Sequence, residues 1–448
     1  MKIALILPIN KNKDTAMNKD LNGGFGTCDE YGDSVSSRII KFIKQRSVRL
    51  PVISFAFLQA IFKQQGHEVD YFEESLPSKG EYDLILIYGT VVDYKNEKAT
   101  TELLKDRFPK AKVGIFGPFP ATKPELFEGV GDFILTGEPE SFFMNDFKDL
   151  SQLKGRVPSS SETNMDLLPS PDFDNFPIKK YSYSPAITKK PFLVLQASKG
   201  CPYSCKYYCV YGDYQGPRIR QRSAKKVVDD IIHLQNKYKI KGIQFRDPVF
   251  GLNRTWVKEF YGELKNRNVK IEWGMETRLD LLNEENIKMM HEVGLRNINV
   301  GIETSDPEIA DKNKRKLVAS NHQESIINYC KRIGVGISAF FILGYDGDTI
   351  ETMRKTVNYA IKLNTPLARF SVATPYPGTG YYDQLEKENK LLTKDFEQYN
   401  QFNLVHKHEN LTPQQVKKEL ESALRKYYFR PSYFFSLTKH LIKNKFLN

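Results

Sequence analysis

Cysteine, histidine and tryptophan are scarce in this 448-residue chain, which has five, seven and two of them. Five cysteines do not make a disulfide framework, and a chain of this size does not need one. We therefore expect a reducing, cytoplasmic setting in which cysteines serve a metal or redox site. No stretch supplies the roughly eighteen apolar residues of a membrane-spanning helix. The apolar start Lys2–Leu7 ends at Pro8, without a signal peptide's small-residue cleavage site.

Acidic residues are fewer than basic ones, 54 against 66, which gives a formal net charge of +12. The excess is diffuse, and no nucleic-acid-binding motif accompanies its denser stretches, so we expect no nucleic-acid partner. Such a charge also suits an anionic substrate, a phosphorylated cofactor or an anionic membrane face. The plainest interpretation is a solvated, lysine-rich surface.

Three of the five cysteines stand close together, as Cys201-Pro-Tyr-Ser-Cys205-Lys-Tyr-Tyr-Cys209. The apolar run Phe192–Gln196 before them predicts a buried strand. The cysteines then lie on the loop at its carboxyl end, where α/β sheets and barrels place their chemistry. Three thiolates this close indicate an iron–sulfur cluster or a zinc ion. Zinc needs a fourth ligand, which no nearby His or Cys offers, whereas a cluster with three protein thiolates leaves one iron open to a ligand.

Residues 1–145 alternate short apolar runs with amphipathic stretches, which predicts a doubly wound, Rossmann-like α/β domain. The expected strands are Lys2–Leu7, Glu68–Phe72, Leu84–Tyr88, Val113–Phe116 and Phe133–Leu135. Small residues follow two of them, in Gly117–Thr122 and Gly137–Glu140, and would let a large flat or phosphorylated ligand approach. The polar stretch Asn10–Ser37 is too long for a plain connection and indicates a mobile lid or an insertion. Cys28 within it is expected to be a free surface thiol.

Residues 146–190 are rich in Ser, Pro and Asp and are expected to form a linker. A regular strand–helix rhythm then occupies residues 191–390. The expected strands are Phe192–Gln196, Gly242–Arg246, Lys270–Gly274, Arg296–Gly301, Val335–Leu343 and Ala368–Thr374. Six such units joined by right-handed crossovers predict a partial barrel, open on one side. Cys330 has the spacing of a core position in one of its helices.

Residues 391–448 leave this rhythm and predict a helical extension. Thr412-Pro413 opens a helix that runs to Tyr428, because it combines an N-cap with a proline in the first turn. The basic helix after it, with an aromatic flank, is expected to pack on the open side of the barrel. Peripheral contact with an anionic membrane is the alternative.

Six segments, in chain order, resemble the motifs of radical S-adenosylmethionine (SAM) enzymes. They are Lys199–Cys205, Phe245–Phe250, Glu276–Arg278, Gly301–Ser305, Phe341–Tyr345 and Thr374–Thr379. Together with the first domain, they make the chain similar to the cobalamin-binding subgroup over nearly its full length. One departure stands out. The family spacing is Cys-x-x-x-Cys-x-x-Cys, which would place the third cysteine where Tyr208 stands, one residue before Cys209.

The resemblance implies that Cys201, Cys205 and Cys209 hold a [4Fe–4S] cluster whose open iron binds the amine and carboxylate of SAM. A bulge in the loop would absorb the extra residue. A corrinoid, cobalamin, is the other implied cofactor, and its nucleotide tail is expected to contact residues of the first domain. Those contacts are Gly117, Thr122, Gly137 and Glu138. No Asp-x-His-x-x-Gly motif offers a lower ligand to cobalt.

The resemblance also implies contacts for SAM itself. Glu303 is expected to bind the ribose hydroxyls, Tyr208 to lie on the adenine and Gly344 to lie beside it. Arg278 is expected to bind the methionine carboxylate, with Arg220 and Arg222 as alternatives, and Asp247 is expected on the SAM side. Each has a plainer role open to it. Glu303 could cap the helix near Pro307, Arg278 could pair with Asp280, Asp247 could cap a turn at Pro248, and Tyr208 could be packing.

The leading hypothesis is therefore a cobalamin-dependent radical SAM enzyme, a class B methyltransferase acting on an unactivated carbon or phosphorus. Its substrate would be a small molecule of natural-product or lipid type. Its partner would be an electron donor such as flavodoxin or ferredoxin. Two alternatives stay open. The corrinoid could serve a cyclisation, oxidation or ring rearrangement without methyl transfer, or the chain could be a corrinoid or iron–sulfur sensor.

Overall fold

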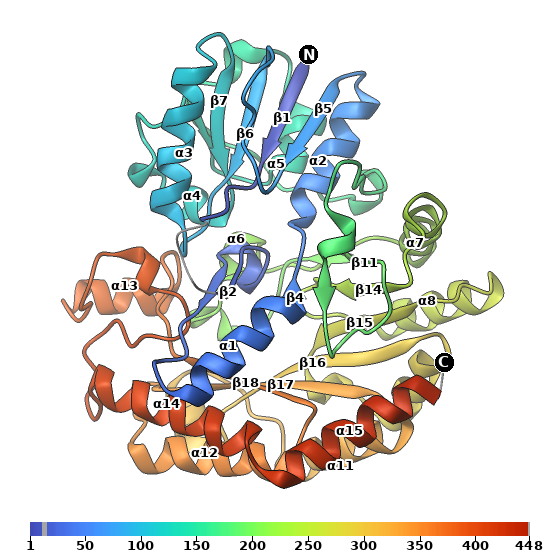
Figure 1. Ribbon diagram of the computed structural model, residues 1–448, viewed down its shortest axis with the longest axis vertical. Helices are drawn as coiled ribbons and strands as arrows, with labels where there is room; N and C mark the ends of the chain where they lie inside the picture. The colour runs from blue at the N-terminus through green and yellow to red at the C-terminus, as the bar shows by residue number, and fades with distance from the viewer. Residues whose placement is uncertain (11–15, 447–448) are drawn as a thin grey trace.

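Two parallel six-stranded sheets organise the computed structural model, which describes residues 1–10 and 16–446 (Figure 1). The first sheet has the strand order β5-β1-β6-β7-β8-β9 and the second β11-β14-β15-β16-β17-β18. Both have helices on their flanks. The predicted doubly wound first domain and the partial barrel after it are confirmed.

The first sheet is built from short, buried strands. They are β1 (Lys2–Ile6), β5 (Glu68–Phe72), β6 (Leu84–Tyr88), β7 (Lys112–Phe116), β8 (Phe133–Leu135) and β9 (Gly155–Val157). All of β6 is buried, as expected for a parallel strand covered on both faces. Helices α2 (Ile53–Gln64) and α3 (Tyr94–Arg107) flank it. Strand β9 pairs with β8, so the range 146–190, expected to be a linker, completes this sheet.

The second sheet forms the partial barrel. Its strands are β11 (Phe192–Leu195), β14 (Gly242–Phe245), β15 (Glu272–Thr277), β16 (Leu295–Glu303), β17 (Gly336–Leu343) and β18 (Leu367–Val372). The helices are α7 (Ala224–Tyr238), α8 (Arg254–Asn266), α9 (Glu284–Glu292), α10 (Pro307–Lys312), α11 (Ser320–Ile333) and α12 (Ile350–Leu363). Besides α10, which begins at Asp306, four of them begin at a polar residue whose side chain accepts from the first turn, as N-caps do. These caps are Ser223, Asn253, Asn283 and Thr349.

One hydrophobic core runs through both sheets. Ile3 and Phe55 of the first domain belong to the same buried cluster as Trp273 and Phe341 of the barrel. Trp273 is fully buried, and its indole N–H donates to the carbonyl of Val293 at 2.9 Å. Cys330 is buried in this core, as its position on α11 predicts.

The insertion after β1 lies between the first sheet and the barrel rather than over the surface. Strand β2 (Ala16–Asn18) pairs with β3 (Thr27–Asp29), and the turn between them is largely buried. In this turn the Asp20 carboxylate accepts from Arg246 of the barrel at 2.7 Å. Cys28 is buried, so the expectation of a surface thiol is wrong. Residues 11–15 of the predicted lid lie outside the described residues.

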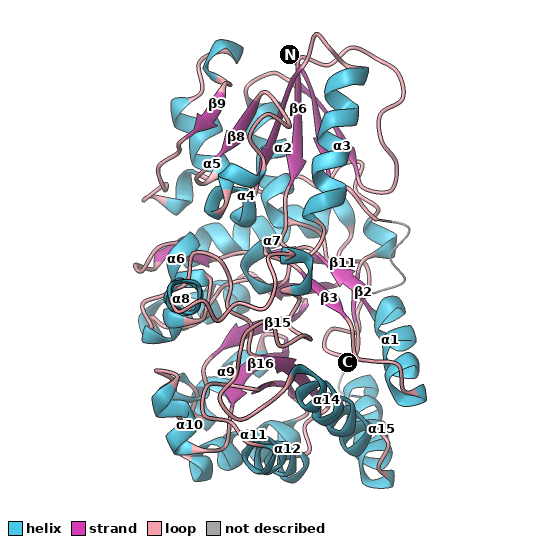
Figure 2. Ribbon diagram, turned by 90° about the vertical axis from the view of Figure 1, so that its left-hand side faces the viewer, coloured by secondary structure: helices cyan, strands magenta, loops and turns pink. Residues whose placement is uncertain are grey.

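Helix α1 (Val35–Ser47) follows and was not predicted from the sequence. Its N-cap Ser34 accepts from the backbone of Ser37. Beyond it, β4 (Val48–Arg49) pairs with β10 (Ser182–Tyr183). The insertion thus reaches from the first domain across to the open side of the barrel (Figure 2).

Helix α13 (Gly380–Lys387) follows the last barrel strand, and two helices form the C-terminal extension: α14 (Pro413–Tyr428) and α15 (Pro431–Phe446). Thr412 caps α14, as predicted, by accepting from the backbone of Gln415. Helix α14 lies against α12 and β18, and α15 lies beside the open side of the barrel (Figures 1 and 2). The side chains of the predicted basic face, Lys439, His440, Lys443 and Lys445, lie outside the described part of the chain. No helix among the described residues is long and apolar enough to cross a membrane.

His406 of this extension gives a pH prediction. It is fully buried, its Nε2 lies 2.9 Å from the Tyr381 hydroxyl, and desolvation lowers its pKa to about 3. An unfolded histidine titrates near 6.5, so below that pH the unfolded state binds a proton that the folded state does not. Stability should therefore fall as the pH drops from about 6.5 towards 3, by up to about 1.4 kcal/mol per pH unit.

The measurement is the free energy of unfolding by urea at several pH values between 6.5 and 4.5. His406→Gln removes the titrating group, so its free energy should depend less steeply on pH than that of the wild type. Parallel curves for the two proteins would contradict the assignment.

Candidate active site

The cysteine loop leaves β11 and turns through a short 3-10 segment, Ser204–Tyr207. The backbone N–H of Cys209 donates to the carbonyl of Cys205 at 3.0 Å, which is the bonding of one α-helical turn. This turn places the two thiols on one face and takes up the extra residue in the spacing. Cys201, Cys205 and Cys209 all line one cavity of about 580 Å³.

The electrostatics around these thiols favour at least one thiolate. A hydrogen bond from Cys209, with the charges of Arg315 and Arg278, lowers the pKa of Cys205 to about 6. Burial raises the pKa of Cys201, and the Cys205 interaction and burial raise that of Cys209. Thiolate is the form that binds iron, so Cys205 is prepared as a ligand and the two others would ionise on binding.

Four guanidinium groups and two carboxylates line the same cavity, and those of Arg315, Arg278 and Glu303 lie at the end that holds the cysteines. Arg315 Nη2 lies 3.7 Å from Glu303 Oε1 and donates to the carbonyl of Gly301 at 2.7 Å. Arg278 is buried, lies 4.2 Å over the ring of Tyr203, and pairs with Asp280 at 2.9 Å. Arg278 therefore does pair with Asp280, as its plainer role predicts, but its side chain is buried rather than at the surface.

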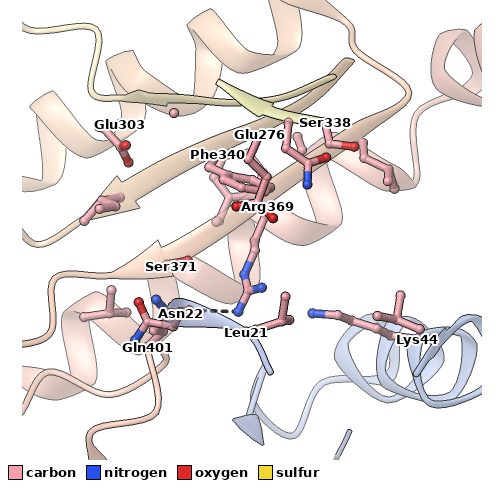
Figure 3. Close-up of a pocket in the computed structure, with 18 of the residues that line it drawn as sticks. Leu21, Asn22, Lys44, Glu276, Glu303, Ser338, Phe340, Arg369, Ser371 and Gln401 are labelled. Carbon is pink, nitrogen blue, oxygen red and sulfur yellow. Dashed lines mark hydrogen bonds between the residues drawn. The ribbon is translucent and has the colours of Figure 1, made fainter. Parts of the chain in front are cut away.

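Glu303 owes its direction to an irregular backbone. Its φ is +70°, and the register of β16 against β17 shifts between Gly301 and Glu303. A residue with a side chain is uncommon in this conformation, which concentrates at functional sites. Glu303 does not cap α10, because Asp306 accepts from the backbone of Glu308 and Ile309 there. Figure 3 shows Glu303 at one side of the cavity, with Arg369 between it and Lys44.

Tyr208 and Tyr345 form an aromatic corner of the cavity, with ring centroids 5.5 Å apart and edge to face. Ile309, Ile342 and Ala373 pack around them. Neither buried hydroxyl makes a hydrogen bond of good geometry with the described protein atoms. An apolar corner with unsatisfied polar atoms suits a nucleoside, which offers a flat face and several acceptors.

Four other predicted residues lie outside the lining of this cavity. Asp247 is buried and accepts from the Ala197 backbone at 3.1 Å and the Ser198 hydroxyl at 2.6 Å, so it holds the exit of β11. Gly344 lies near Val416 and Leu404, at the base of α14. Arg222 and Arg220, the alternatives to Arg278, are engaged elsewhere: Arg222 pairs with Asp230, and Arg220 pairs with Glu138.

Three lining residues were not singled out from the sequence. Arg315 follows Lys312-Asn313-Lys314, and such a charged run resembles solvated surface. Tyr345 ends the Phe341–Tyr345 motif without a signal of its own. Arg369 also lacks a signal, because a charge between the apolar neighbours Ala368 and Phe370 is the alternation expected of a strand with one solvent-facing side.

The expected cobalamin contacts lie at the carboxyl edge of the first sheet. A Cβ on Gly117 would meet the Gly89 carbonyl oxygen at 2.5 Å, and one on Gly137 would meet that of Ser159 at 2.3 Å. Thr122 donates to the carbonyl of Pro118 at 2.7 Å. Glu138 pairs with Arg220 and, at 3.5 Å, with Lys199 of the barrel. These four residues therefore pack against other parts of the chain and do not line an open binding pocket.

A small cavity of about 50 Å³ is what remains between this edge and the barrel. The turn of the insertion occupies the rest. Tyr88 donates to the Gly24 carbonyl at 3.2 Å, and Tyr211, Arg246 and Asp20 line the remaining space. A drug-sized ligand already needs roughly 300 to 1,000 Å³, and a corrinoid is larger. The residues present, as arranged here, do not fit cobalamin.

The cysteine cavity does fit a cluster with SAM. Its lining includes three thiols, the guanidinium groups of Arg278 and Arg315, the carboxylate of Glu303 and an aromatic corner with unsatisfied hydroxyls. No three His, Cys, Asp or Glu side chains among the described residues are close enough to share a single metal ion. A [4Fe–4S] cluster does not require this, since each thiolate binds an iron of its own.

Comparison with known proteins agrees with this geometry. Residues 195–360 match the radical SAM superfamily. The chain is 30% identical over 416 residues to an uncharacterized methyltransferase of Pyrococcus horikoshii, covering 85% of this chain and 88% of that protein. It is 21% identical to bacteriochlorophyllide d C-8(2)-methyltransferase of Chlorobaculum tepidum, over 77% of each chain. It is 26% identical to the anaerobic magnesium-protoporphyrin IX monomethyl ester cyclase of Rubrivivax gelatinosus, over 62% of this chain and about half (49%) of that protein.

Two solved structures share the fold. One is the radical SAM methyltransferase TsrM from Kitasatospora setae with cobalamin and a [4Fe–4S] cluster bound. It has a TM-score of 0.64 and 16% identity, covering 86% of this chain and 78% of that one. The other is the cobalamin-dependent radical enzyme OxsB with aqua-cobalamin and SAM bound. It has a TM-score of 0.65 and 14% identity, covering 100% of this chain and 72% of that one.

Proposed function

Because the chain belongs to the radical SAM superfamily, we propose that it cleaves SAM reductively and methylates an unactivated carbon, or a phosphorus, of a largely apolar small molecule. The observation that carries this proposal is that three thiols lie with Arg278, Arg315 and Glu303 in a single, mostly apolar cavity. Relatives that are named methyltransferases support the methyl transfer.

Cys201, Cys205 and Cys209 would hold the [4Fe–4S] cluster, which supplies an electron to SAM when both are bound. An external donor such as flavodoxin or ferredoxin would provide that electron. Arg278 and Arg315 would bind the methionine carboxylate, because a planar guanidinium matches a carboxylate with two parallel hydrogen bonds.

Glu303 would accept from the ribose hydroxyls, and Tyr208 with Tyr345 would hold the adenine. These groups are buried or nearly so, and the apolar walls of the cavity exclude water. Exclusion of water protects odd-electron chemistry from side reactions. Asp247 and Gly344 would support this site from behind, since neither lines the cavity.

The far part of the cavity would hold the substrate. Its surface is mostly apolar. Figure 3 shows polar groups within it, among them Lys44, Arg369 and Gln401. Arg369 Nη2 donates to Gln401 at 2.8 Å, and Lys44 binds Asp29 at 2.7 Å and the Tyr31 hydroxyl at 2.9 Å. Such a lining suits a molecule with a long apolar part and one polar group, which Arg369 would orient.

Methyl transfer in this class relies on cobalamin as the methyl carrier. The closed gap between the domains means that a corrinoid would enter only if the turn around Asp20 moved away. The expected contacts Gly117, Thr122, Gly137 and Glu138 depend on that movement. The closed gap favours a second candidate, in which SAM cleavage drives a cyclisation, oxidation or ring rearrangement without methyl transfer. Two relatives named cyclases support it.

Anaerobic reconstitution tests both. Iron, sulfide and corrinoid are counted per chain, with and without added hydroxocobalamin, and products are analysed after reduction in the presence of SAM. About four irons and release of 5′-deoxyadenosine are expected. Bound corrinoid with S-adenosylhomocysteine and a methylated product supports the first candidate. 5′-Deoxyadenosine without S-adenosylhomocysteine supports the second. Protein that holds the cluster but does not cleave SAM would instead support the iron–sulfur sensor. Protein that binds no iron would overturn both candidates.

Glu303→Gln tests the SAM site directly. A charge-assisted hydrogen bond contributes about 1.5–3 kcal/mol, so the dissociation constant of SAM should rise roughly ten- to hundredfold. The measurement is equilibrium dialysis with labelled SAM and cluster-loaded protein. Glu308→Gln on α10 is the matched control, because Glu308 is exposed and does not line the cavity. Equal affinity in the wild type and in Glu303→Gln would contradict the role given to Glu303.

A further inference from the structure

Large apolar side chains are unusually exposed on two helices, α1 and α15. Of the thirteen large apolar residues exposed in the described part of the chain, seven lie on these two helices. They are Val35, Ile39, Phe42 and Ile43 on α1, and Phe434, Phe435 and Ile442 on α15. We call the surface formed by these seven residues the mouth. Concentrated apolar exposure of this kind marks a surface that meets another apolar phase or partner.

The mouth is continuous with the candidate active site. Ile39 and Ile43 of α1 and Phe434 of α15 line the same cavity as Cys201 and Glu303. These three residues are also 42%, 57% and 56% exposed, so the cavity reaches the surface between the two helices. Figures 1 and 2 place α1, α14 and α15 on the same side of the barrel. An apolar molecule could thus pass from the surface to the thiols along apolar walls.

Basic residues accompany the apolar ones on α1. The helix carries Arg38, Lys41 and Arg46, besides Lys44, which binds Asp29 inside the cavity, and it has no acidic residue. The Arg46 guanidinium lies 3.5 Å from the centre of the exposed Phe42 ring, so charge and apolar surface are presented together. A helix with exposed aromatic and aliphatic side chains among cations has the character of those that lie in the surface of an anionic membrane.

We propose that the mouth docks on an anionic lipid bilayer, and that the substrate is a lipid which enters the cavity from that bilayer. This rests on the proposed function, since it names the substrate class of the same site. A bilayer fits better than a protein partner for two reasons. The cations on α1 match the charge of anionic headgroups, and the opening of the cavity within the apolar patch lets a lipid reach the site without crossing water.

Co-sedimentation of the full chain with vesicles tests the docking. The wild type should bind vesicles of phosphatidylcholine mixed with phosphatidylglycerol, bind phosphatidylcholine alone more weakly, and release as salt is added. The double variant Phe42→Ser with Phe435→Ser should bind at least about tenfold more weakly. Both residues are exposed and neither lines the cavity, so the fold and the SAM site should be unaffected.

Leu103→Ser is the matched control, because Leu103 is a similarly exposed apolar residue on α3, far along the chain from the mouth. It should bind vesicles like the wild type. Failure of the wild type to bind anionic vesicles overturns the docking, as does an equal loss in the control. A dimer that the double variant dissociates, with no vesicle binding, would assign the mouth to a second copy of the chain instead.

Formation of 5′-deoxyadenosine is measured in the same preparations, which separates the two proposals. Cleavage of SAM by protein that binds no vesicles overturns the docking alone. Vesicle binding by protein that does not cleave SAM supports the docking and counts only against the proposed function.

Discussion

Cys209→Ala is expected to lose the iron–sulfur cluster as completely as Cys201→Ala or Cys205→Ala, although Cys209 stands one residue beyond the family spacing. Cys209 lies one helical turn from Cys205 and lines the same cavity, so each thiol would bind a separate iron. Loss of one ligand from a set of three exposes a second iron and destabilises the whole cluster. SAM cleavage should fall to background, by at least about 10³-fold, because these residues act as a unit.

Iron and sulfide counts, the visible absorbance of the cluster and 5′-deoxyadenosine release check this expectation. Cys330→Ala is the control, since Cys330 is buried in α11 away from the cavity and should retain the cluster. A second variant, Tyr208→Cys with Cys209→Ala, restores the family spacing. It should not restore the cluster, because the side chain at 208 points to Tyr345 and the apolar corner. A fully loaded Cys209→Ala protein would show that the cluster does not use this thiol.

Arg222→Met is expected to cost about 3 kcal/mol of folding free energy, because it removes the guanidinium from a buried carboxylate and leaves it only Lys226 at 3.3 Å and the Ser170 hydroxyl at 2.6 Å. Arg222 Nη1 lies 2.6 Å from Asp230 Oδ2, and both side chains are 0% exposed. Arg222 also donates to the carbonyl of Leu168 at 3.0 Å. The double variant Arg222→Met with Asp230→Leu should recover much of the loss, since an apolar pair can replace a buried ion pair.

Urea unfolding followed by tryptophan fluorescence measures these changes, and SAM affinity is measured in parallel on cluster-loaded protein. Unchanged SAM affinity in the single variant would agree with a structural role for Arg222. The opposite result would be a loss of less than about 1 kcal/mol, which is the range of an exposed pair, together with a weaker affinity for SAM. That result would indicate that Arg222 contributes to SAM binding.

The strands could be predicted from the sequence where burial is complete. Leu84–Tyr88 is apolar throughout, because β6 is covered on both faces, and its predicted bounds match the structure. Helix α1 could not be predicted, because several of its apolar residues face the surface rather than a core. Strand β9 was also missed. It has three residues, begins with Gly155 and is buried only at Val157, so no periodicity marks it.

Those site residues that lie at the carboxyl ends of strands could be predicted from the sequence. Cys201 follows β11, Arg278 follows β15 and Glu303 ends β16, and parallel strands bring their carboxyl ends to one edge. The direction in which each of these side chains points could not be predicted from the sequence. Asp247 also ends a strand, but its carboxylate turns back to Ala197 and Ser198. The gap between the domains was unpredictable for a related reason, since nothing in Asn10–Ser37 reveals that its turn fills that space.

The core shared by the two sheets has a consequence for the chain as a whole. Because Phe55 and Trp273 belong to one buried cluster, separating the halves would expose apolar surface on both cut faces. Neither half could then be exchanged freely for a domain of another protein. The protein should unfold in one cooperative thermal transition. Recombination that joins the first domain to a different barrel would have to restore this shared apolar interface.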